Sequence, residues 1–346
     1  MAIVHMAKRE KRITIYDLAK SLNIAPSSVS KALNNSHAIS SKIKKMVEDK
    51  AKELNYIHNT NAANLRRGFT RIIGVIVPKI NESFFANIIA GIEKVCVQYQ
   101  YSLIICQTEE SLEKEVNAVK TLIRQNVDCI LISLSLETQT TAHLEEIKNN
   151  HIHFIQFDRV SPAVDSYTVV NDNAAASYQA VKHLAEQGYQ KIAYFGGPAH
   201  LNLYQERKKG YKNALKDLGL TFNEAFVKDE IISTENGRQE ALSLLQADVK
   251  PDAFLCTSDY VSLGVLEALK TLNLTSPKDI GIIGFANEMF TQLIQPSLSS
   301  VNQFSYEMGE QIAKLYFDEV MKNKENDKVK SVKVKTEIVE RSSSSR

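Results

Sequence analysis

Short apolar runs alternate with longer amphipathic stretches along most of the chain, beginning near Arg71. The runs are rich in Ile, Val, Leu and Phe, which is typical of strands buried on both faces of a parallel sheet. The stretches between them have apolar residues at helical spacing, so each could cover such a sheet. Two such series meet near Asn171 and predict two doubly wound lobes. The predicted strands are 72–77, 103–106, 129–132, 154–157, 191–197, 253–256 and 280–285, and the predicted helices are 84–99, 111–126, 139–149, 177–187, 204–218, 235–246 and 261–272.

The C-terminal part of the chain predicts that the two lobes exchange segments. A helix is expected over 306–320 and an edge strand over 331–339, where apolar and polar residues mostly alternate. The segment Ser342–Ser345 with Arg346 is expected to be disordered. The expected limits are about 71–171 with 303–326 for lobe 1, about 172–302 with 327–343 for lobe 2, and hence 71–343 for the whole body.

The N-terminal part predicts a helix-turn-helix. Residues 13–34 read ITIYDLAKSLNIAPSSVSKALN, a pattern of two short helices joined by a tight turn. Thr14 is placed to cap the first helix, and Pro26 suits the first turn of the second, where its missing N–H needs no partner. A second helix with small polar residues outside can enter the major groove of DNA, where a lysine reaches base edges or phosphate. Its outward residues are Ser27, Ser28, Ser30, Lys31 and Asn34.

The charge distribution supports a nucleic-acid partner for this head. Through Arg71 the chain has 14 Lys and Arg against 5 Asp and Glu, whereas the remainder is acidic and the whole chain has a net charge of only +2. A basic segment on an acidic body suits a polyanion that binds the basic segment alone.

The sequence lacks the motifs of several other protein classes. We find no nucleotide-binding glycine pattern, no zinc-protease motif and no nucleophile elbow, so we expect no enzyme, no cofactor and no metal. The four cysteines have no C-x-x-C spacing and are expected to be buried free thiols. The opening residues contain no continuous apolar segment and no run is long enough to span a membrane. These observations favour a cytoplasmic location.

The motif T-I-Y-D-L-A…S-S-V-S-K-A-L-N…I-S…L-N-Y…N-x-x-A-x-x-L resembles the lactose-repressor (LacI/GalR) family of bacterial transcription factors. The resemblance continues to the C-terminus. It implies that Thr14 and Tyr16 contact phosphates and that Pro26, Ser27 and Lys31 occupy base-reading positions. Tyr56, in the L-N-Y part of the motif, belongs to the same expected DNA-binding set. The chain departs from the family pattern at Ala25, Lys31 and His58, where Ser, Arg and Pro are common.

A polar arm follows this domain, and two interpretations of it remain open. Residues 11–58 are expected to form the DNA-binding domain, and 59–70 the arm. A short run of small and polar residues buries too little surface to be helical alone, so the arm is either a flexible linker or a segment that folds on a partner. The resemblance implies a hinge helix that forms on operator DNA, with Leu65 as a minor-groove wedge. The expected contacts of this arm come from Asn59, Ala62, Leu65 and Arg66.

In the body, polar and aromatic residues follow the predicted strands at the edge where open α/β sheets bind ligands. Amides, a carboxylate, a guanidinium and aromatic rings together suit a small hydroxylated ligand. By resemblance, five of these residues match effector-contacting positions of the family. Ser258 and Ala286 depart from the family pattern, so a sugar acid, an oligosaccharide or a nucleoside-like compound stays open. The expected effector-binding residues are Asn81, Phe84, Phe85, Asp158, Arg207, Ser258, Asp259, Phe285, Asn287 and Gln303, of which Phe84, Asp158, Arg207, Asn287 and Gln303 carry the resemblance.

These patterns predict an all-α helix-turn-helix head and an α/β body of two doubly wound parallel sheets, similar to periplasmic binding proteins. The predicted function is a homodimeric transcriptional regulator, by default a repressor, that binds a pseudo-palindromic operator. A small effector, expected to be a carbohydrate, would control its affinity from the cleft between the lobes. The alternative is a sugar-binding transport protein, which shares the two-lobed body but has no use for a basic head.

Overall fold

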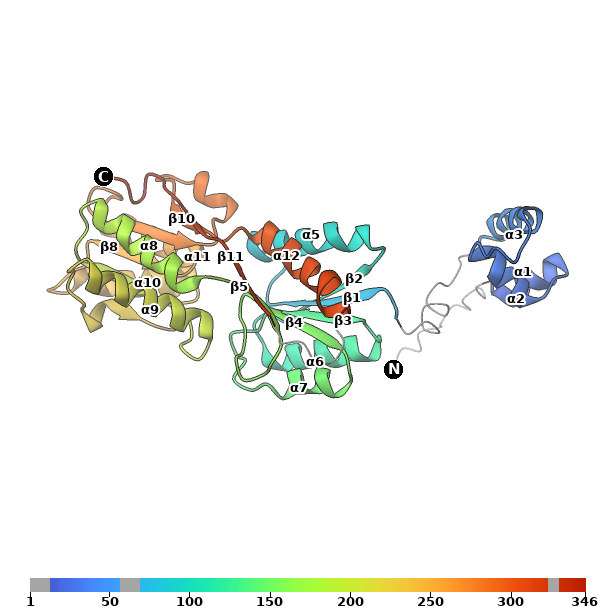
Figure 1. The fold of residues 1–346 in the computed structure, drawn as a ribbon. Helices are drawn as coiled ribbons and strands as arrows, with labels where there is room; N and C mark the ends of the chain where they lie inside the picture. Colours follow the sequence, from blue (N-terminus) through green and yellow to red (C-terminus); the bar gives the residue numbers. More distant parts are fainter. Residues whose placement is uncertain (1–12, 57–68, 323–329) are drawn as a thin grey trace, which may run out of the picture. The chain divides into compact units, whose positions relative to one another are not determined.

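The fold is described from a computed structural model of the chain, which describes residues 13–56, 69–322 and 330–346. The chain divides into two compact units, Met1–Thr70 and Arg71–Arg346. Figure 1 shows the first unit as a group of helices and the second as a two-lobed α/β body. The predicted contacts of the arm at Asn59, Ala62, Leu65 and Arg66 lie outside the described residues.

The first unit contains three short helices around a small apolar core. They are α1 (Ile15–Leu22), α2 (Pro26–Leu33) and α3 (Ser41–Glu53). Thr14 caps α1 as predicted, because its hydroxyl accepts the backbone N–H of Asp17 while its own N–H donates to the Asp17 carboxylate. The core is formed by Leu18, Ala19, Val29, Ala32, Val47 and Ala51.

The first lobe of the body contains a six-stranded sheet with the order β11-β5-β4-β3-β1-β2, and all its neighbouring strands are parallel. Its central strands are apolar and fully buried, as the sequence pattern predicts. The strands are β1 (Ile72–Val77), β2 (Ser102–Gln107), β3 (Cys129–Ile132), β4 (His153–Phe157), β5 (Tyr167–Asn171) and β11 (Ser331–Val334), and the helices are α5 (Ser83–Gln98), α6 (Leu112–Arg124), α7 (Ala142–Asn149) and α12 (Ser305–Asp318).

The second lobe repeats this design with the order β12-β10-β9-β8-β6-β7, where only the edge strand β12 runs antiparallel to its neighbour. The predicted fold class is therefore confirmed. The strands are β6 (Ile192–Phe195), β7 (Val227–Lys228), β8 (Ala253–Cys256), β9 (Gly281–Phe285), β10 (Ser299–Asn302) and β12 (Glu337–Val339). The helices are α8 (Asn173–Glu186), α9 (Asn202–Asp217), α10 (Thr234–Gln246) and α11 (Asp259–Thr271), with short 3₁₀ turns η1 (Glu224–Phe226) and η2 (Met289–Gln292). A third 3₁₀ turn, η3 (Val320–Lys322), follows α12 in lobe 1.

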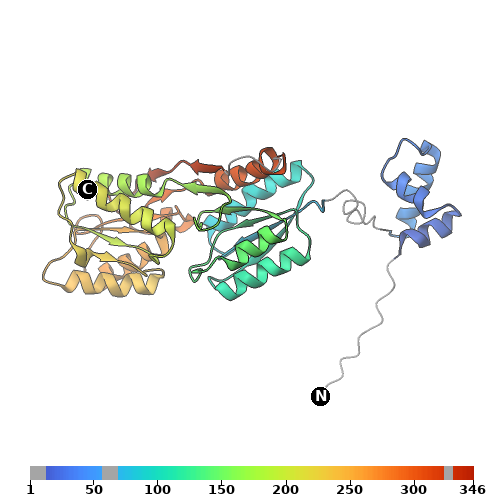
Figure 2. The ribbon, with the colours of Figure 1, turned by 60° about the horizontal axis from the view of Figure 1, so that its bottom comes forward.

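The chain crosses between the lobes at β5–α8, at β10–α12 and again at β11–β12, and Figure 2 shows the two lobes joined along one side. The last crossing corrects the prediction that 327–343 belongs to lobe 2. Ser331–Val334 pairs with β5 in the sheet of lobe 1, and only Glu337–Val339 joins lobe 2. At this side of the body, each sheet has an edge where a further strand can pair. The strand conformation is interrupted at Lys335 and Thr336, so the two halves of one alternating segment can pair with different sheets.

The C-terminal serines are ordered, contrary to the prediction of disorder. Ser343 and Ser344 are fully buried in lobe 2. The Ser343 hydroxyl donates to the carbonyl of Ile282 at 2.7 Å and accepts the N–H of Ser299 at 2.8 Å. A serine-rich segment can be buried when each hydroxyl is paired, and composition alone does not reveal such partners.

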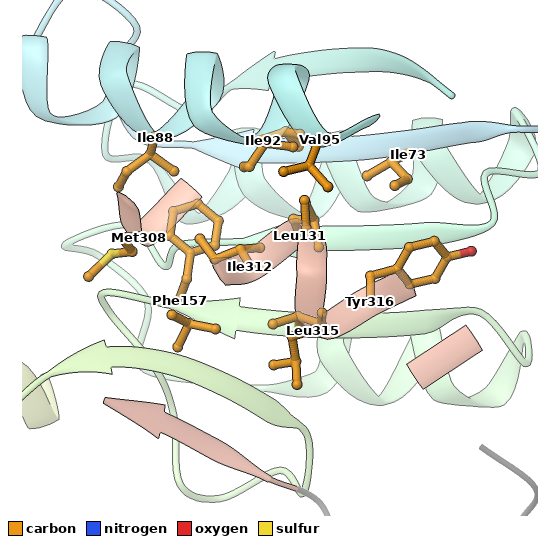
Figure 3. Packing of buried hydrophobic residues seen from close by; sticks show 14 of the residues in the cluster. Ile73, Ile88, Ile92, Val95, Leu131, Phe157, Met308, Ile312, Leu315 and Tyr316 are labelled. Atoms are coloured by element: carbon orange, nitrogen blue, oxygen red, sulfur yellow. The ribbon is translucent and has the colours of Figure 1, made fainter. Parts of the chain in front are cut away.

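Helices α5 and α12 pack closely and form one side of lobe 1. Figure 3 shows Ile88, Ile92 and Val95 of α5 facing Met308 and Ile312 of α12 above the sheet. Glycines allow this approach. A Cβ on Gly91 would lie 2.1 Å from the carbonyl oxygen of Tyr306, and one on Gly309 would lie 2.1 Å from that of Ile88. The two helices are therefore closely packed against each other.

The cysteines are reduced. Cys96, Cys129 and Cys256 are buried and Cys106 is half-buried, all as free thiols. Burial raises the pKa of the Cys96 and Cys256 thiols to about 12, which makes both unreactive. Within the described ranges, no helix is long and apolar enough to cross a membrane.

Candidate functional site

The outer face of α2 presents the predicted DNA-reading residues. Pro26 begins the helix, and Ala25 before it provides no side-chain cap. Ser27 and Lys31 are exposed, while Ser28 and Ser30 are half-buried beside them. The short side chains leave the backbone of α2 accessible, which is the shape a helix needs to lie in the major groove.

Other predicted residues of the head have different environments. The ring of Tyr16 is 71% exposed at the start of α1, and nearby Thr14 is engaged in the cap. Asn34 uses its amide to close the end of α2, because its Nδ2 donates to the carbonyl of Ser30 at 2.7 Å. Tyr56 is half-buried and packs against the core of the head. Tyr16 is thus the more exposed of the two predicted tyrosines in the head.

A cavity lies between the two lobes of the body, at the carboxyl ends of their strands. Its empty volume is about 700 Å³ when the space at its open mouth is included. Of the predicted effector-binding residues, Phe84, Phe85, Asp158, Arg207, Ser258, Phe285 and Gln303 line it.

Arg207 on α9 is the most constrained of these side chains. It is 3% exposed, its Nε donates to Asn173 Oδ1 at 2.9 Å, and its Nη1 donates to the carbonyl of Thr257 at 2.9 Å. The guanidinium lies 4.1 Å from the centre of the Phe285 ring. Burial lowers the pKa of Arg207, and the nearby Asp158 carboxylate opposes that shift. The cation is therefore held in a fixed orientation at the cavity wall.

Asp158 presents a carboxylate to the same cavity from the end of β4. It is 6% exposed and has a left-handed backbone with φ of 55°, which is uncommon for residues other than glycine. No described residue donates a hydrogen bond to its carboxylate. Burial raises its pKa, and the neighbouring Arg159 and Arg207 act in the opposite direction. A buried carboxylate without a protein donor is suited to accept hydrogen bonds from a ligand.

The remaining predicted residues of the lining have supporting bonds. Ser258 caps α11, because its hydroxyl accepts the N–H of Tyr260 at 3.3 Å. Gln303 donates from Nε2 to Asn171 Oδ1 at 2.9 Å, so its side chain is held at a crossing between the lobes. Phe84 and Phe85 meet edge to face with ring centres 5.1 Å apart.

Three predicted effector-binding residues do not line the cavity. Asn81 is exposed on the loop before α5. Asp259 is fully buried inside lobe 2, where its Oδ1 accepts the Ser300 hydroxyl at 2.7 Å and its Oδ2 accepts the N–H of Glu288 at 2.8 Å. The first residue of a helix that follows a strand can point into its own lobe as easily as outward, and the spacing does not distinguish the two. Burial raises the pKa of Asp259 to about 7.

Asn287 is the third, and it supports the loop after β9. It has a φ of 53°, its N–H donates to the Ser300 hydroxyl at 2.9 Å, and its Oδ1 accepts Arg341 Nη2 at 2.8 Å. Its side chain is thus directed to the C-terminal segment and not to the cavity. That segment is distant in sequence, so the partner was not predictable from the pattern.

The lining also contains polar residues outside the predicted effector-binding set. Arg159 is buried and its Nη1 donates to Glu110 Oε2 at 2.7 Å. Tyr204 on α9 and Glu288 after β9 also line the cavity. Of these three residues, Arg159 is the one that the sequence itself pointed to, because it directly follows the predicted site residue Asp158. Among the residues that the structure describes, no group of three His, Cys, Asp or Glu side chains could hold a metal ion.

Comparisons with known proteins identify relatives of both units. The family model described as "Bacterial regulatory proteins, lacI family" matches residues 14–59, and that of a "Periplasmic binding protein-like domain" matches 181–344. The HTH-type transcriptional repressor CytR of Escherichia coli K12 is 31% identical over 313 residues, which cover 90% of this chain and 91% of CytR.

Two solved structures show the same fold over nearly the whole chain. The lac repressor dimer bound to operator and the anti-inducer ONPF has a TM-score of 0.83 at 21% identity, covering 97% of this chain and 100% of that one. The complex of the transcriptional regulator CelR with cellobiose has a TM-score of 0.72 at 24% identity, covering 96% and 100%.

Proposed function

The chain belongs to the lacI family of DNA-binding transcriptional regulators, and from this premise we propose that it is a homodimeric repressor controlled by a neutral, carbohydrate-like effector in the interlobe cavity. The observation that carries the effector proposal is the pair of opposite charges in the cavity wall. Arg207 is fixed against Phe285 by two hydrogen bonds, and no residue in the described part of the chain donates to the Asp158 carboxylate. A hydroxylated ligand can donate to Asp158, accept from Arg207 and stack its C–H face on an aromatic ring.

The charge of the lining supports a neutral ligand over an anionic one. Two of the three cations already have carboxylate partners, because Lys79 pairs with Glu82 at 2.9 Å and Arg159 pairs with Glu110 at 2.7 Å. An added phosphate or carboxylate would meet more negative than positive charge. The carboxylates of the lining are Glu82, Glu110, Asp158 and Glu288, and its cations are Lys79, Arg159 and Arg207. Cellobiose, present in the CelR structure, is a neutral disaccharide of the class we propose here.

We assign operator binding to the head and to the arm that follows it. Residues 11–58 would read the major groove through α2, and 59–70 would order on DNA as a hinge. One recognition helix reads one half-site, so a two-fold dimer of the body, 71–343, would match a pseudo-palindromic operator. Exposed apolar side chains support a covered surface on the body. Met289 is 68% exposed and Leu293 is 72% exposed, both at η2.

The regulatory assignment also supports a cytoplasmic protein, because a repressor acts where the chromosome is. The alternative of a sugar-binding transport protein does not account for the family match over the head. Closure of the cleft on a ligand would change the separation of the two hinges in a dimer, and operator affinity would follow.

A two-step experiment tests the proposed function on the full chain. Selection from fragmented genomic DNA should yield a small set of related, pseudo-palindromic sequences with binding that weakens as salt rises. The selected duplex is then titrated in the presence of matched neutral and anionic compounds: cellobiose and cellobionate, glucose and glucose 6-phosphate, cytidine and CMP. We expect a neutral member to change operator affinity and its anionic partner to have no effect. Failure to select any duplex, or a response to anionic members alone, would refute the proposal.

A further inference from the structure

The helix that begins at the cavity, α5, has no cap within its own lobe. Its N-cap residue Glu82 makes no side-chain hydrogen bond to the helix, and its first turn contains no acidic residue. The first N–H groups of a helix have no intrahelical partner, and the helix dipole gives this end a partial positive charge. The start of α5 therefore requires an acceptor from elsewhere.

That acceptor is Glu288, which comes from the opposite lobe. Its Oε2 accepts the N–H of Ser83 at 3.2 Å, its Oε1 accepts the N–H of Phe84 at 3.2 Å, and the Ser83 hydroxyl also donates to Oε2. Ser83 and Phe84 are the first two residues of α5, whereas Glu288 follows β9 of lobe 2. One buried carboxylate thus caps a helix across the cavity with three charge-assisted hydrogen bonds.

Both ends of this contact are firmly held. On the lobe 2 side, the N–H of Glu288 donates to Asp259 Oδ2 at 2.8 Å. Ala286, two residues earlier, has a φ of 106°, a strained value for a residue with a side chain. On the lobe 1 side, α5 is locked to α12 by the close approach at Gly91 and Gly309. Because each end is anchored in its own lobe, we expect opening of the cleft to break the contact.

Among the described residues, another hydrogen bond across this cleft is weaker. His200 of lobe 2 lies with Nε2 2.8 Å from the carbonyl oxygen of Leu136 in lobe 1. This single bond is exposed to solvent, where water replaces either partner at little cost. The bonds of Glu288 are buried or partly buried, and their loss would leave both a carboxylate and a helix terminus unpaired.

We propose that Glu288, together with Ser83 and Phe84, forms a clasp that holds the two lobes closed before any effector binds. The clasp rests on the proposed function, because it regulates the cavity assigned to the effector. Its consequence is that the effector-free protein populates the closed cleft, and that removing the clasp shifts the protein toward an open one.

The test measures the distance between the lobes in the full chain, without effector or operator. Spin labels are placed at Glu113→Cys and Gln239→Cys, which are exposed on the helices that follow β2 and β7. These strands lie at the sheet edges farthest from the crossings between the lobes, where opening moves the labels most. The half-buried Cys106 is replaced by Ser, and the three buried thiols remain.

Two variants remove the clasp from opposite sides. Glu288→Ala deletes the acceptor, and Ser83→Pro deletes two of the three donors while proline remains favourable at the first position of a helix. Each should lower the ratio of the short-distance to the long-distance population about tenfold or more, which corresponds to loss of one hydrogen bond to a charged group. The double variant should be no more open than the stronger single variant.

A matched control is Glu310→Ala, which removes an ion pair between Lys94 on α5 and Glu310 on α12, 2.6 Å apart within lobe 1. It should leave the distance distribution unchanged. The clasp is refuted if Glu288→Ala and Ser83→Pro leave the distribution unchanged, if the control opens the cleft equally, or if the unmodified protein is already open. None of these results bears on operator selection, so a failed clasp and a failed regulatory function are distinguishable.

Discussion

In the head, Ser27 and Lys31 are exposed on a short helix, and the described structure shows no bond that fixes either side chain. In the cavity, Arg207 is 3% exposed and is held by two hydrogen bonds to protein groups. The head is held together by a core of six buried residues, whereas the body has several large clusters. If the proposed roles hold, we expect DNA to order the reading surface, whereas the effector would bind a surface whose side chains the protein already holds.

The largest effect is expected for Arg207→Ala, which tests whether the ordered cavity wall binds the effector. The substitution removes a preordered cation from the cavity, and we expect the affinity for a neutral effector identified by the titration to fall roughly 1,000-fold. Operator affinity without effector should stay within about twofold, because the head is a separate unit. Calorimetry and operator titration measure the two effects. Lys209→Ala, exposed on the same helix, is the control, and a wild-type effector affinity in Arg207→Ala would remove the cavity assignment.

The free energy of unfolding of the body should depend on pH through one buried carboxyl group, that of Asp259. Asp259 has a pKa of about 7 in the folded body against 3.8 for the free side chain. Between these values the unfolded chain loses the proton while the folded body keeps it, so the free energy of unfolding should fall as pH rises from 4 to 7 and then level off. The decrease attributable to this group is on the order of 4 kcal/mol.

Denaturant unfolding of the body at several pH values checks this decrease. Asp259→Asn should flatten the curve between pH 4 and 7. Asp279→Asn is the control, because hydrogen bonds from Thr275 lower the pKa of Asp279 and keep it ionised over most of that range. If Asp259→Asn preserves the full slope, another group is responsible for it.

The independence of the two units can itself be tested with Leu18→Ala. Leu18 is fully buried in the small core of the head, and its truncation should cost about 3 kcal/mol. Scanning calorimetry should show the head unfolding at lower temperature and the transition of the body unchanged. Leu22→Ala, at a half-buried position of α1, should have a smaller effect. A joint shift of both transitions would show that the units are coupled.

The comparison also explains what the sequence could and could not predict. Local signals identify the head, because the Thr14 cap and Pro26 at the start of α2 act within four residues of their own position. In the body, alternation predicts the buried strands, but β5 and β10 were missed because their residues are polar or half-buried. Strand order and edge pairing depend on residues far apart, which is why the division of the tail between two sheets was not foreseen.

The residues of the site were also predicted only where the signal is local. Asp158 and Arg207 were predicted because residues at strand ends and on the following helices meet at one edge of an open sheet. Asp259 was misplaced, because the spacing places a residue near that edge but does not say whether its side chain enters the cavity or its own lobe. Glu288 was missed because its partners Ser83 and Phe84 lie more than 200 residues earlier in the chain. Pairs at that separation leave no periodic signal.

The smallest of these effects is expected for Lys31→Ala in the head. Lys31 is exposed on α2, and the operator gives it a partner that the free protein does not fix. Its removal should weaken operator binding about tenfold and lower the slope of log affinity against log salt by about one, if Lys31 contacts a phosphate. Loss of affinity for one operator base with an unchanged salt slope would instead assign it to a base edge. Lys216→Ala on the body carries the same change in charge, so an equal loss of affinity there would show that net charge, and not the reading helix, determines binding.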